Sequence, residues 1–383
     1  MRLKSPTTLA LLLALLLAPL LLLTAVARRA AAQTGAPAAT GPDWTAVDAY
    51  VRGEMVKQRV PGLAMAVVRN GALLRAQGYG SANLEHNVPV TAATVFQSGS
   101  VGKQFTATLV MQLIGEGRLS LDDRLAKFFP SGPAVWREIT IRQLLSHTSG
   151  ISEKFYEKVD LHLEYADSTV ARIIGEQPLD FVPGSKWSYS NPGYVMLGYV
   201  IEKVTGRFYG DLLEERIFGP LGMSTAMIIN EPTIVPNRAA GYETEAGTIV
   251  NQAWVSRKFN TTADGSLYLT VLDLAKWDAA LYGDRVLAQA SLAQMWTPIR
   301  LNGGATHPYG FGWALGNVNG HRIIEHGGAW QGFKTYIARY VGDGLTVIVM
   351  MNLGEANPGT FAHGIAGVIE PALKAAPAAP ARP

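Results

Sequence analysis

The sequence predicts an α+β fold in which both ends of the chain build one antiparallel sheet, flanked by helices, while the middle forms an inserted, mainly helical lobe. Three observations support this prediction. Apolar strand-like runs lie near the N-terminal end, three more lie near the C-terminal end, and helical periodicity dominates the residues between them. Short turns between consecutive strands favour antiparallel pairing, and separation of strands from helices along the chain is typical of α+β proteins.

The N-terminal part of the folded chain begins with an amphipathic helix at 43–58, where an apolar residue recurs every three or four positions from Trp44 to Met55. Two apolar strands follow, joined by Asn70-Gly71. This dipeptide is the strongest short-range signal for a tight hairpin. We therefore expect the two strands to pair with each other.

The C-terminal part supplies three further strand-like runs, HRIIEHGG, GFKTYIARY and LTVIVMMN, separated by short turns. A helix, PGTFAHGIAGVIEPALKA, follows them, whereas the middle is mainly helical, as in VARIIGEQ and GYVMLGYVIEKVTG. We assign a sheet lobe to about 43–100 together with 305–370, and a helical lobe to about 101–304. A cleft between two such lobes is the first place to expect a site.

The first residues have the features of a secretory signal peptide. Residues 1–32 combine a basic start, a leucine-rich run and a small-residue stretch that ends at Ala32. We expect export to the periplasm or the medium, with an uncleaved membrane anchor as the alternative because the apolar run is long. Segments 33–42 and 371–383 are rich in Pro and Ala, which predicts a flexible linker and a disordered tail around a folded domain at 43–370.

Composition excludes several classes of function. The 383 residues contain no cysteine, which rules out disulfides, thiol catalysis and thiolate metal sites. The formal charge of +3 falls to −1 once the four basic residues of 1–32 are removed. A nearly neutral chain with no later basic cluster has no electrostatic footprint for nucleic acid.

The stretch FQSGSVGKQFTA, residues 96–107, fits one of three chemical motifs. A phosphate-binding loop needs glycine where Gln97 stands and Ser or Thr where Gln104 stands. A nucleophile elbow needs glycine where Ser98 stands. The motif S-x-x-K remains, with Ser100 one helical turn before Lys103.

This pair has useful chemistry if a helix begins near Ser100. A lysine that is partly desolvated in a cleft can act as a base, and a helix N-terminus favours a developing negative charge. The alternative is a plain helix N-cap serine followed by a surface lysine. The helix is expected to end at Gly115 and Gly117. Its expected buried stripe consists of Val101, Phe105, Leu109 and Leu113.

Two later motifs favour the catalytic interpretation. Tyr189 and Asn191 form Y-x-N, and His326 opens an H-G-G sequence. Each has a local structural alternative: Asn191 before Pro192 as a helix N-cap, Tyr189 as a core side chain, and His326 as a strand end before a Gly-Gly turn. These alternatives do not explain why S-x-x-K, Y-x-N and H-x-G each occur once and in this order.

In this combination of motifs the chain resembles the serine β-lactamase-like hydrolases related to class C β-lactamases. That family includes D-alanyl-D-alanine carboxypeptidases, D-amino-acid peptidases and amidases, and esterases. The resemblance covers about 45–370 and extends to LSLDDRLAKFFP, ITIRQLLSHTSGI, FVPGSKWSYSNPGYVMLGYVIEKVTG, IFGPLGM and YGFGW. It implies a β-lactamase/transpeptidase-like fold and an exported hydrolase that works through an acyl-enzyme.

The resemblance also implies a role for each motif residue. Ser100 would be the acylated nucleophile and Lys103 its base partner. Tyr189 would exchange protons with the leaving group and with water, and Asn191 would hydrogen-bond Lys103 or the substrate. His326 would orient or polarise Tyr189. Whether Lys103 or Tyr189 takes the first proton stays open, because coupled groups titrate together.

The oxyanion hole would consist of the backbone N–H groups of Ser100 and Ala329. No cofactor is required. The run HRIIEH has one residue too many for the metal motif H-x-x-E-H, and on a strand His321 and Glu325 would face away from His326. No metal site is therefore expected.

The H-G-G motif departs from the family pattern because Gly327 stands where the family has a threonine that holds a substrate carboxylate. We expect a peptidase or esterase acting on a small-molecule or peptide substrate, with weak or no β-lactamase activity, and a monomer. Alternatives are a true class C-like β-lactamase and a catalytically idle member that binds peptidoglycan or a partner. The cleft residues proposed on this basis are Gly327, Gly328 and Trp330, with Phe155, Tyr156 and Tyr309 as either cleft walls or plain packing.

Overall fold

The computed structural model describes residues 41–374, within which seven strands form one antiparallel sheet. The strand order is β11-β12-β13-β14-β1-β2-β3, so strands from the two ends of the chain meet where β14 pairs with β1. The predicted signal peptide and nearly all of the linker, 1–40, lie outside the described residues, as do 375–383. The strands are β1 (Gly62–Arg69), β2 (Ala72–Asn83), β3 (Val88–Pro89), β11 (Ala314–Val318), β12 (His321–Trp330), β13 (Phe333–Tyr340) and β14 (Leu345–Met351).

The remaining described residues form helices, short strands, 3₁₀ and π-helical turns, and irregular segments. The α-helices are α2 (Trp44–Gln58), α3 (Lys103–Gly115), α4 (Ile141–Leu145), α5 (Asp167–Glu176), α6 (Asn191–Thr205), α7 (Tyr209–Leu213), α8 (Gly219–Leu221), α9 (Val271–Ala280), α10 (Gln289–Met295) and α11 (Pro358–Ile369). The short strands are β4 (Phe96–Gln97), β5 (Met227–Ile228), β6 (Tyr242–Glu245), β7 (Thr248–Asn251), β8 (Leu267–Leu269), β9 (Ile299–Arg300) and β10 (Thr306–His307). They form three small sheets, β4-β8-β5, β9-β10 and β6-β7.

The hairpin predicted at Asn70-Gly71 joins β1 to β2. Both turn residues have positive φ, 50° and 76°, as a tight hairpin turn requires, and Arg69 pairs with Ala72. The strand β1 then pairs with β14 from Leu63↔Met351 to Arg69↔Leu345. The prediction of an antiparallel sheet completed by the C-terminal strands is confirmed.

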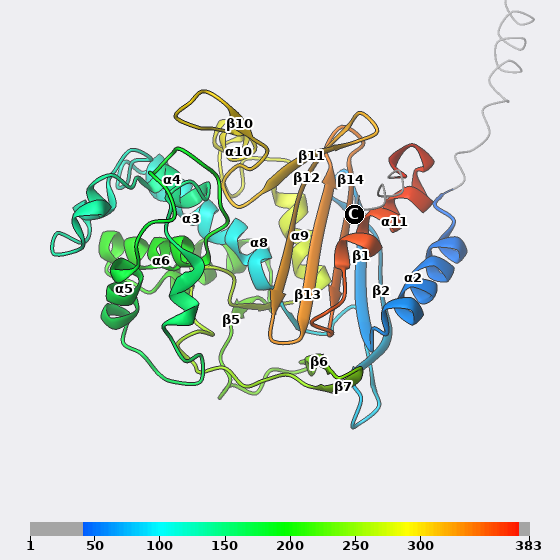
Figure 1. Ribbon diagram of the computed structural model, residues 1–383. Helices are drawn as coiled ribbons and strands as arrows, with labels where there is room; N and C mark the ends of the chain where they lie inside the picture. Colours follow the sequence, from blue (N-terminus) through cyan, green and yellow to red (C-terminus); the bar gives the residue numbers. More distant parts are fainter. Residues whose placement is uncertain (1–40, 375–383) are drawn as a thin grey trace, which may run out of the picture. The chain divides into compact units, whose positions relative to one another are not determined.

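Helices cover both faces of this sheet (Figure 1). Helix α11 packs on β13 and β14, and α9 packs on β1, β2 and β14 from the other side. Every residue of β14 is consequently buried. A strand covered on both faces reads as a continuous apolar run, which is why LTVIVMMN lacks polar alternation.

The assignment of all of 101–304 to a separate helical lobe is wrong for α9, because this helix packs on the sheet. Its Asp278 is completely buried and accepts hydrogen bonds from Arg339 Nε on β13 at 2.6 Å and from Thr346 Oγ1 on β14 at 2.8 Å. Local helical periodicity in the sequence cannot indicate such long-range partners.

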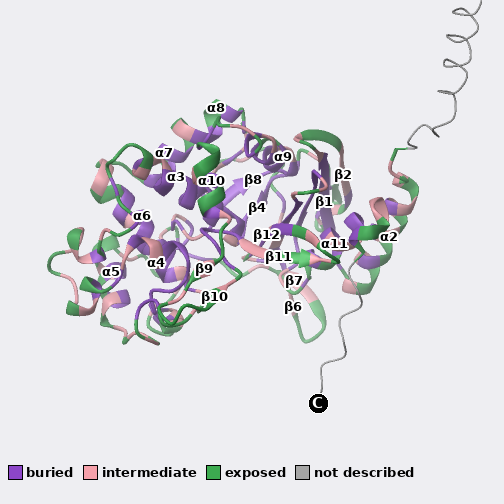
Figure 2. Ribbon diagram, turned by 90° about the horizontal axis from the view of Figure 1, so that it is seen from above, coloured by how far each residue is buried: buried purple, intermediate pink, exposed green. Residues whose placement is uncertain are grey.

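Helix α3 is buried on nearly every side, and not only along the expected stripe (Figure 2). Two of its buried polar side chains bond neighbouring segments: Gln104 accepts from Trp277 Nε1 at 2.9 Å, and Thr106 donates to Ala263 O at 2.6 Å. The helix ends at Gly115, and Gly117 has φ +71°, as the sequence predicts. A helix surrounded by protein gives the reactive residues at its start a fixed position.

The disordered tail predicted from 371 begins too early. Pro371–Leu373 form a 3₁₀ turn in which Leu373 is completely buried. Asn319 Nδ2 also donates to the carbonyls of Ala372 and Lys374. Between residues 41 and 374, no helix combines the length and apolarity needed to cross a membrane.

Candidate active site

Two backbone segments approach each other closely at the start of α3. The 3₁₀ turn η1 (Gly99–Gly102) lies against β12. A Cβ on Gly99 would lie 2.3 Å from Ala329 N, and one on Gly328 would lie 2.0 Å from Ser98 O. Only glycine fits at either position, and this contact brings Ser100 beside the β12 residue Ala329.

Lys103 is completely buried and its amine is surrounded by neutral acceptors. Nζ lies 3.1 Å from Ser100 Oγ, 2.6 Å from Asn191 Oδ1 and 2.5 Å from the backbone carbonyl of Asp264. The surface-lysine alternative is therefore wrong. Ser100 lies inside η1, whose N-cap is Ser98, so Ser100 is not a helix cap.

Asn191 is available to Lys103 because another residue caps α6. Ser190 is the N-cap, and its Oγ accepts from Gly193 N at 3.1 Å, so the N-cap alternative for Asn191 is wrong. Asn191 donates instead to Glu153, through its backbone N–H to Oε1 and through Nδ2 to Oε2 at 3.2 Å. These bonds leave its side-chain oxygen to accept from Lys103.

Tyr189 lies beside the lysine amine, with Lys103 Nζ 4.9 Å from the centre of its ring. Its hydroxyl is buried and has no hydrogen-bond partner among the described residues. The centres of the Tyr189 and His326 rings lie 6.2 Å apart. The hydroxyl is therefore not engaged by any other described group, although Tyr189 is not among the residues that line the cavity at Ser100.

His326 does not hydrogen-bond Tyr189, the residue that the resemblance expects it to orient or polarise. Its Nε2 lies 2.8 Å from Tyr309 Oη and its Nδ1 lies 2.6 Å from Gly327 O. Burial, and then the charge of Lys103, lower the pKa of His326 to about 4, so the ring is neutral at neutral pH. As predicted, Glu325 faces away from it, toward His363 on α11 at 3.2 Å.

Sequence reasoning missed His147, which follows α4. Its carbonyl accepts from Ser188 N at 3.0 Å, its Nδ1 accepts from Ser190 N at 3.1 Å, and its ring packs 4.2 Å from that of Tyr189. His147 has φ +58°, an uncommon conformation for a residue other than glycine. It stands in the stretch ITIRQLLSHTSGI, but no local pattern marked it as part of the site.

A cavity of about 300 Å³ opens at Ser100. Trp330 and Ala329 line it, and Trp330 Nε1 donates to Asn260 Oδ1 at 2.7 Å. Its other lining residues are Gly99, Ser100, Glu153, Tyr156, Leu161, Asn191, Phe259, Asp264, Gly265 and Ser266.

Several proposed cleft residues do not line this cavity. A Cβ on Gly327 would lie 3.2 Å from the ring of Tyr336, on the face of β12 that carries α11, because side chains alternate along a strand. Gly328 packs on the backbone of η1. Phe155 is a core residue with 1% exposure, and Tyr309 is buried against His326, whereas Tyr156 does line the cavity.

Two carboxylates give the cavity its electrostatic character. Asp264 Oδ1 is buried without a hydrogen-bond partner among the described residues, and its Oδ2 lies 3.5 Å from Tyr156 Oη. Burial raises the pKa of Glu153 and Asp264 adds to this, against the hydrogen bonds from Asn191 and the charge of Lys103. No lysine or arginine is among the described lining residues.

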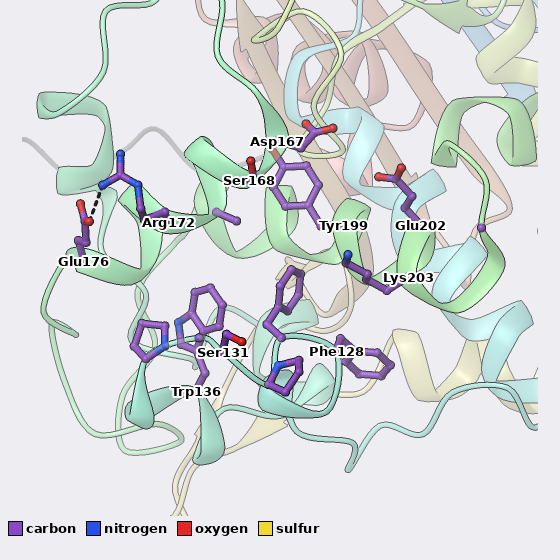
Figure 3. Close-up of a pocket in the computed structure, with 16 residues that line it drawn as sticks. Phe128, Ser131, Trp136, Asp167, Ser168, Arg172, Glu176, Tyr199, Glu202 and Lys203 are labelled. Carbon is purple, nitrogen blue, oxygen red and sulfur yellow. Dashed lines mark hydrogen bonds and ion pairs between the residues drawn. The ribbon is translucent and has the colours of Figure 1, made fainter.

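A larger cavity, of about 920 Å³, lies elsewhere in the helical region (Figure 3). Aromatic side chains including Trp136 and Tyr199 line it, and an ion pair joins Arg172 to Glu176 at 2.5 Å. None of the candidate catalytic residues borders it. The candidate site at Ser100 therefore rests on the chemistry of its side chains and not on cavity size.

The family profile described as Beta-lactamase matches residues 47–366. The chain belongs to this family. Its fold is accordingly β-lactamase/transpeptidase-like, and the protein is a serine hydrolase, as the sequence motifs predicted. Among the residues described, no group of three or more histidine and acidic side chains is placed to hold a metal ion.

Relatives and solved structures place this beta-lactamase family member among enzymes of the peptidase and amidase type. Penicillin-binding protein 4 of Amycolatopsis lactamdurans is 33% identical over 356 residues, which cover 85% of this chain and 91% of the relative. D-aminopeptidase of Gluconobacter oxydans (strain 621H) is 28% identical over 305 residues, covering 76% of this chain and 56% of the relative. The structure of the octameric penicillin-binding protein homologue from Pyrococcus abyssi matches with a TM-score of 0.74 and 27% identity, covering 85% of this chain and 77% of that one.

Proposed function

We propose that this protein is an exported hydrolase that cleaves the amide bond after an N-terminal D-amino acid, through an acyl-enzyme on Ser100. The observation that carries the substrate class is the carboxylate of Asp264, a residue that lines the cavity at Ser100 and whose Oδ1 is buried without a hydrogen-bond partner among the described residues. A buried carboxylate is unfavourable unless a cation or donor meets it, and a substrate ammonium group supplies both. The D configuration follows the name of the aminopeptidase relative.

Acylation begins at the hydrogen bond between the Ser100 hydroxyl and the Lys103 amine. In the uncharged form that acts as the base, Lys103 directs its two N–H bonds to obligate acceptors, the amide oxygen of Asn191 and the carbonyl of Asp264. Its lone pair then faces Ser100 Oγ at 3.1 Å and takes the hydroxyl proton as the oxygen attacks the substrate carbonyl. The negative charge on the carbonyl oxygen is received by the backbone N–H groups of Ser100 and Ala329.

Collapse of the tetrahedral intermediate breaks the amide bond and leaves the acyl group on Ser100. The departing nitrogen receives a proton from Tyr189, whose hydroxyl has no hydrogen-bond partner among the described residues and whose ring lies next to the Lys103 amine. Lys103 then returns its proton to Tyr189. In deacylation, Tyr189 passes its proton to Lys103 and takes a proton from the water that attacks the ester. Lys103 then gives its extra proton to the departing Ser100 oxygen, and the carboxylic acid is released. Each group ends in its starting state.

The acids of the cavity also disfavour other substrates. Glu153 and Asp264 disfavour a substrate carboxylate near Ser100, and no lysine or arginine is among the described residues that line the cavity. β-Lactams and peptides that end in D-Ala-D-Ala carry such a carboxylate. Weak β-lactamase activity is thus proposed from these two acids, and no longer from Gly327, which faces Tyr336.

Hydrolysis of matched substrates tests the proposal. D-alanine p-nitroanilide is compared with its L isomer, with the N-acetylated D compound and with a cephalosporin, using Ser100→Ala as the blank. We expect only the free-amine D compound to be turned over well. Asp264→Asn is isosteric. It is expected to raise the KM for the free-amine D compound by about tenfold while kcat stays within about twofold, because one charge-assisted hydrogen bond to the substrate is lost. Equal turnover of the acetylated compound, or rapid cephalosporin turnover, would overturn the proposed substrate class.

Export is proposed from the signal-like leader at 1–32. Fractionation of cells that express the full chain tests it, with mass spectrometry of the N-terminus to locate cleavage. A mature protein in the periplasm or medium that begins near residue 33 is expected. Full-length protein confined to the cytoplasm would contradict export.

A further inference from the structure

A chain of hydrogen bonds connects the segment that carries Tyr189 with strand β12. Ser190 N lies 3.1 Å from His147 Nδ1, and His147 Nε2 lies 3.2 Å from Tyr309 Oη. The same hydroxyl lies 2.8 Å from His326 Nε2, and His326 Nδ1 lies 2.6 Å from Gly327 O. The three side chains are all buried, so their bonds are made within the protein.

The two backbone groups at the ends of this series of hydrogen bonds determine which atom donates in each bond. A backbone N–H can only donate, so His147 Nδ1 accepts from Ser190 and the ring proton of His147 is on Nε2. A carbonyl can only accept, so His326 carries its proton on Nδ1 and accepts at Nε2. Tyr309 then accepts from His147 and donates to His326. One arrangement of protons satisfies all four bonds.

This arrangement requires both imidazoles to be neutral. Burial and the charge of Lys103 lower the pKa of His147 well below its ordinary value and that of His326 to about 4. The other titratable groups facing the two rings are Tyr189, Tyr194 and Tyr309, and burial raises the pKa of Tyr309 well above its ordinary value. Tyr309 therefore keeps its proton as the donor.

This series of hydrogen bonds acts on Tyr189 through the residues next to Tyr189 in the sequence. His147 bonds the backbone N–H of Ser188 and of Ser190, the residues on either side, and packs its ring against the phenol. At the other end, His326 belongs to the strand that carries the N–H of Ala329. A rigid link between these segments fixes the distance from the phenol to the proposed oxyanion hole.

We propose that His147 and Tyr309 are positioning residues that hold Tyr189 in register with β12, with His326 as the third member of the link and not as a direct partner of Tyr189. The proposal rests on the proposed acylation of Ser100 for its kinetic consequence. The state of the hydrogen bonds themselves can be measured without substrate.

Nuclear magnetic resonance of ¹⁵N-labelled histidine rings tests the link in the intact protein. The chain has 7 histidines, and spectra of His147→Gln and His326→Gln assign the two signals. We expect His147 as the Nε2–H tautomer and His326 as the Nδ1–H tautomer, both neutral from about pH 8 to about pH 5. The opposite tautomer at either ring, or titration of either ring near its ordinary pKa of about 6.5, would overturn the proposal.

Tyr309→Phe tests the kinetic consequence, because it removes one hydroxyl and keeps the ring. We expect kcat for the D-amino-acid anilide to fall by about 100-fold while KM stays within about threefold, since the cavity around Asp264 is unchanged. Tyr336→Phe is the matched control, on the opposite face of the sheet, and is expected to keep full activity. An unchanged kcat in Tyr309→Phe would overturn the positioning role. If wild type lacks activity while the tautomers are as expected, the proposed function fails and the link stands.

Discussion

Two completely or almost completely buried cations, Lys103 in the candidate site and Arg339 in the sheet, are held in opposite ways. Arg339 bonds the buried carboxylate of Asp278 at 2.6 Å and lies over the rings of Tyr282 and Trp296. Among the described residues, no carboxylate lies within bonding distance of Lys103, which is held by an amide oxygen, a backbone carbonyl and a hydroxyl. Both are nearly inaccessible, with exposures of 0% for Lys103 and 3% for Arg339.

The difference separates a structural cation from a reactive one. A buried cation paired with a carboxylate cannot lose its proton without leaving an uncompensated buried charge, so it stays charged. A lysine held by neutral acceptors leaves no orphaned carboxylate when it becomes a neutral amine, and can exchange a proton with Ser100. Burial alone therefore does not mark a catalytic lysine; the charge of its partners does.

The largest expected effect on activity comes from removing the cation of the candidate site, Lys103. Lys103→Met keeps the apolar stem and removes the amine, so Ser100 loses its base. We expect kcat/KM to fall by about 10,000-fold, close to the loss in Ser100→Ala, because members of one catalytic unit are not additive. Steady-state kinetics of the single and double variants check this. A Lys103→Met protein with near-normal activity would show that another group activates the serine.

The corresponding change in the sheet affects stability and not catalysis. Asp278→Asn leaves Arg339 buried without its counter-charge, which is expected to lower the free energy of unfolding by about 3–5 kcal/mol. Activity per folded molecule should stay within about twofold, since Asp278 lies in α9 and is not among the residues that line the cavity at Ser100. Denaturant unfolding and active-site titration measure the two quantities. Adding Arg339→Met should recover much of the lost stability, and no recovery would contradict the charge-pair explanation.

Adjacent glycines on β12 provide a smaller and sharper comparison. Gly328→Ala places a Cβ 2.0 Å from Ser98 O and must displace the backbone that carries the proposed oxyanion donors. We expect kcat to fall by about 100-fold. Gly327→Ala meets only the ring of Tyr336 at 3.2 Å and should lower kcat by less than about threefold. Equal losses of kcat in the two variants would show that kcat depends on any change in β12, and not on the contact between Gly328 and η1.

The smallest expected effect concerns pH. The pKa of Glu153 is raised above its usual 4.5, so this acid loses its charge at a higher pH than an exposed glutamate does. KM for an amine substrate should therefore rise as pH falls through that raised pKa. Glu153→Gln should remove this rise and increase KM at neutral pH by about two- to fivefold. A wild-type KM that is constant from about pH 7 to about pH 5 would contradict the role of Glu153 in binding the amine.

Much of the fold was predictable because local chemistry determines it. Asn70 and Gly71 adopt the positive φ values that their hairpin needs, and the apolar run of β14 reflects cover on both faces. The serine–lysine pair was also predictable, since one helical turn joins the two side chains. Asn191 was identified for its bond to Lys103, although the competing N-cap role belongs to Ser190.

The rest depends on contacts between distant segments. Asp264 lies 161 residues from Lys103 in sequence, yet its carbonyl holds the lysine and its carboxylate lines the cavity. His147 and Tyr309 meet across 162 residues, and neither has a spacing that indicates the other. The register of β12 also determined that Gly327 faces α11. Periodicity cannot supply such pairings, because they arise only when the sheet and the helices assemble.

The most direct test of the central claim is to trap and locate the acyl group. The protein is mixed with a D-alanine ester, quenched in acid within milliseconds, and analysed by intact-mass and peptide-mapping mass spectrometry. We predict an adduct with the mass of the D-alanyl group on Ser100 in the wild type, none in Ser100→Ala, and far slower formation in Lys103→Met. An adduct on another residue, or turnover of the ester by Ser100→Ala at the wild-type rate, would contradict the account.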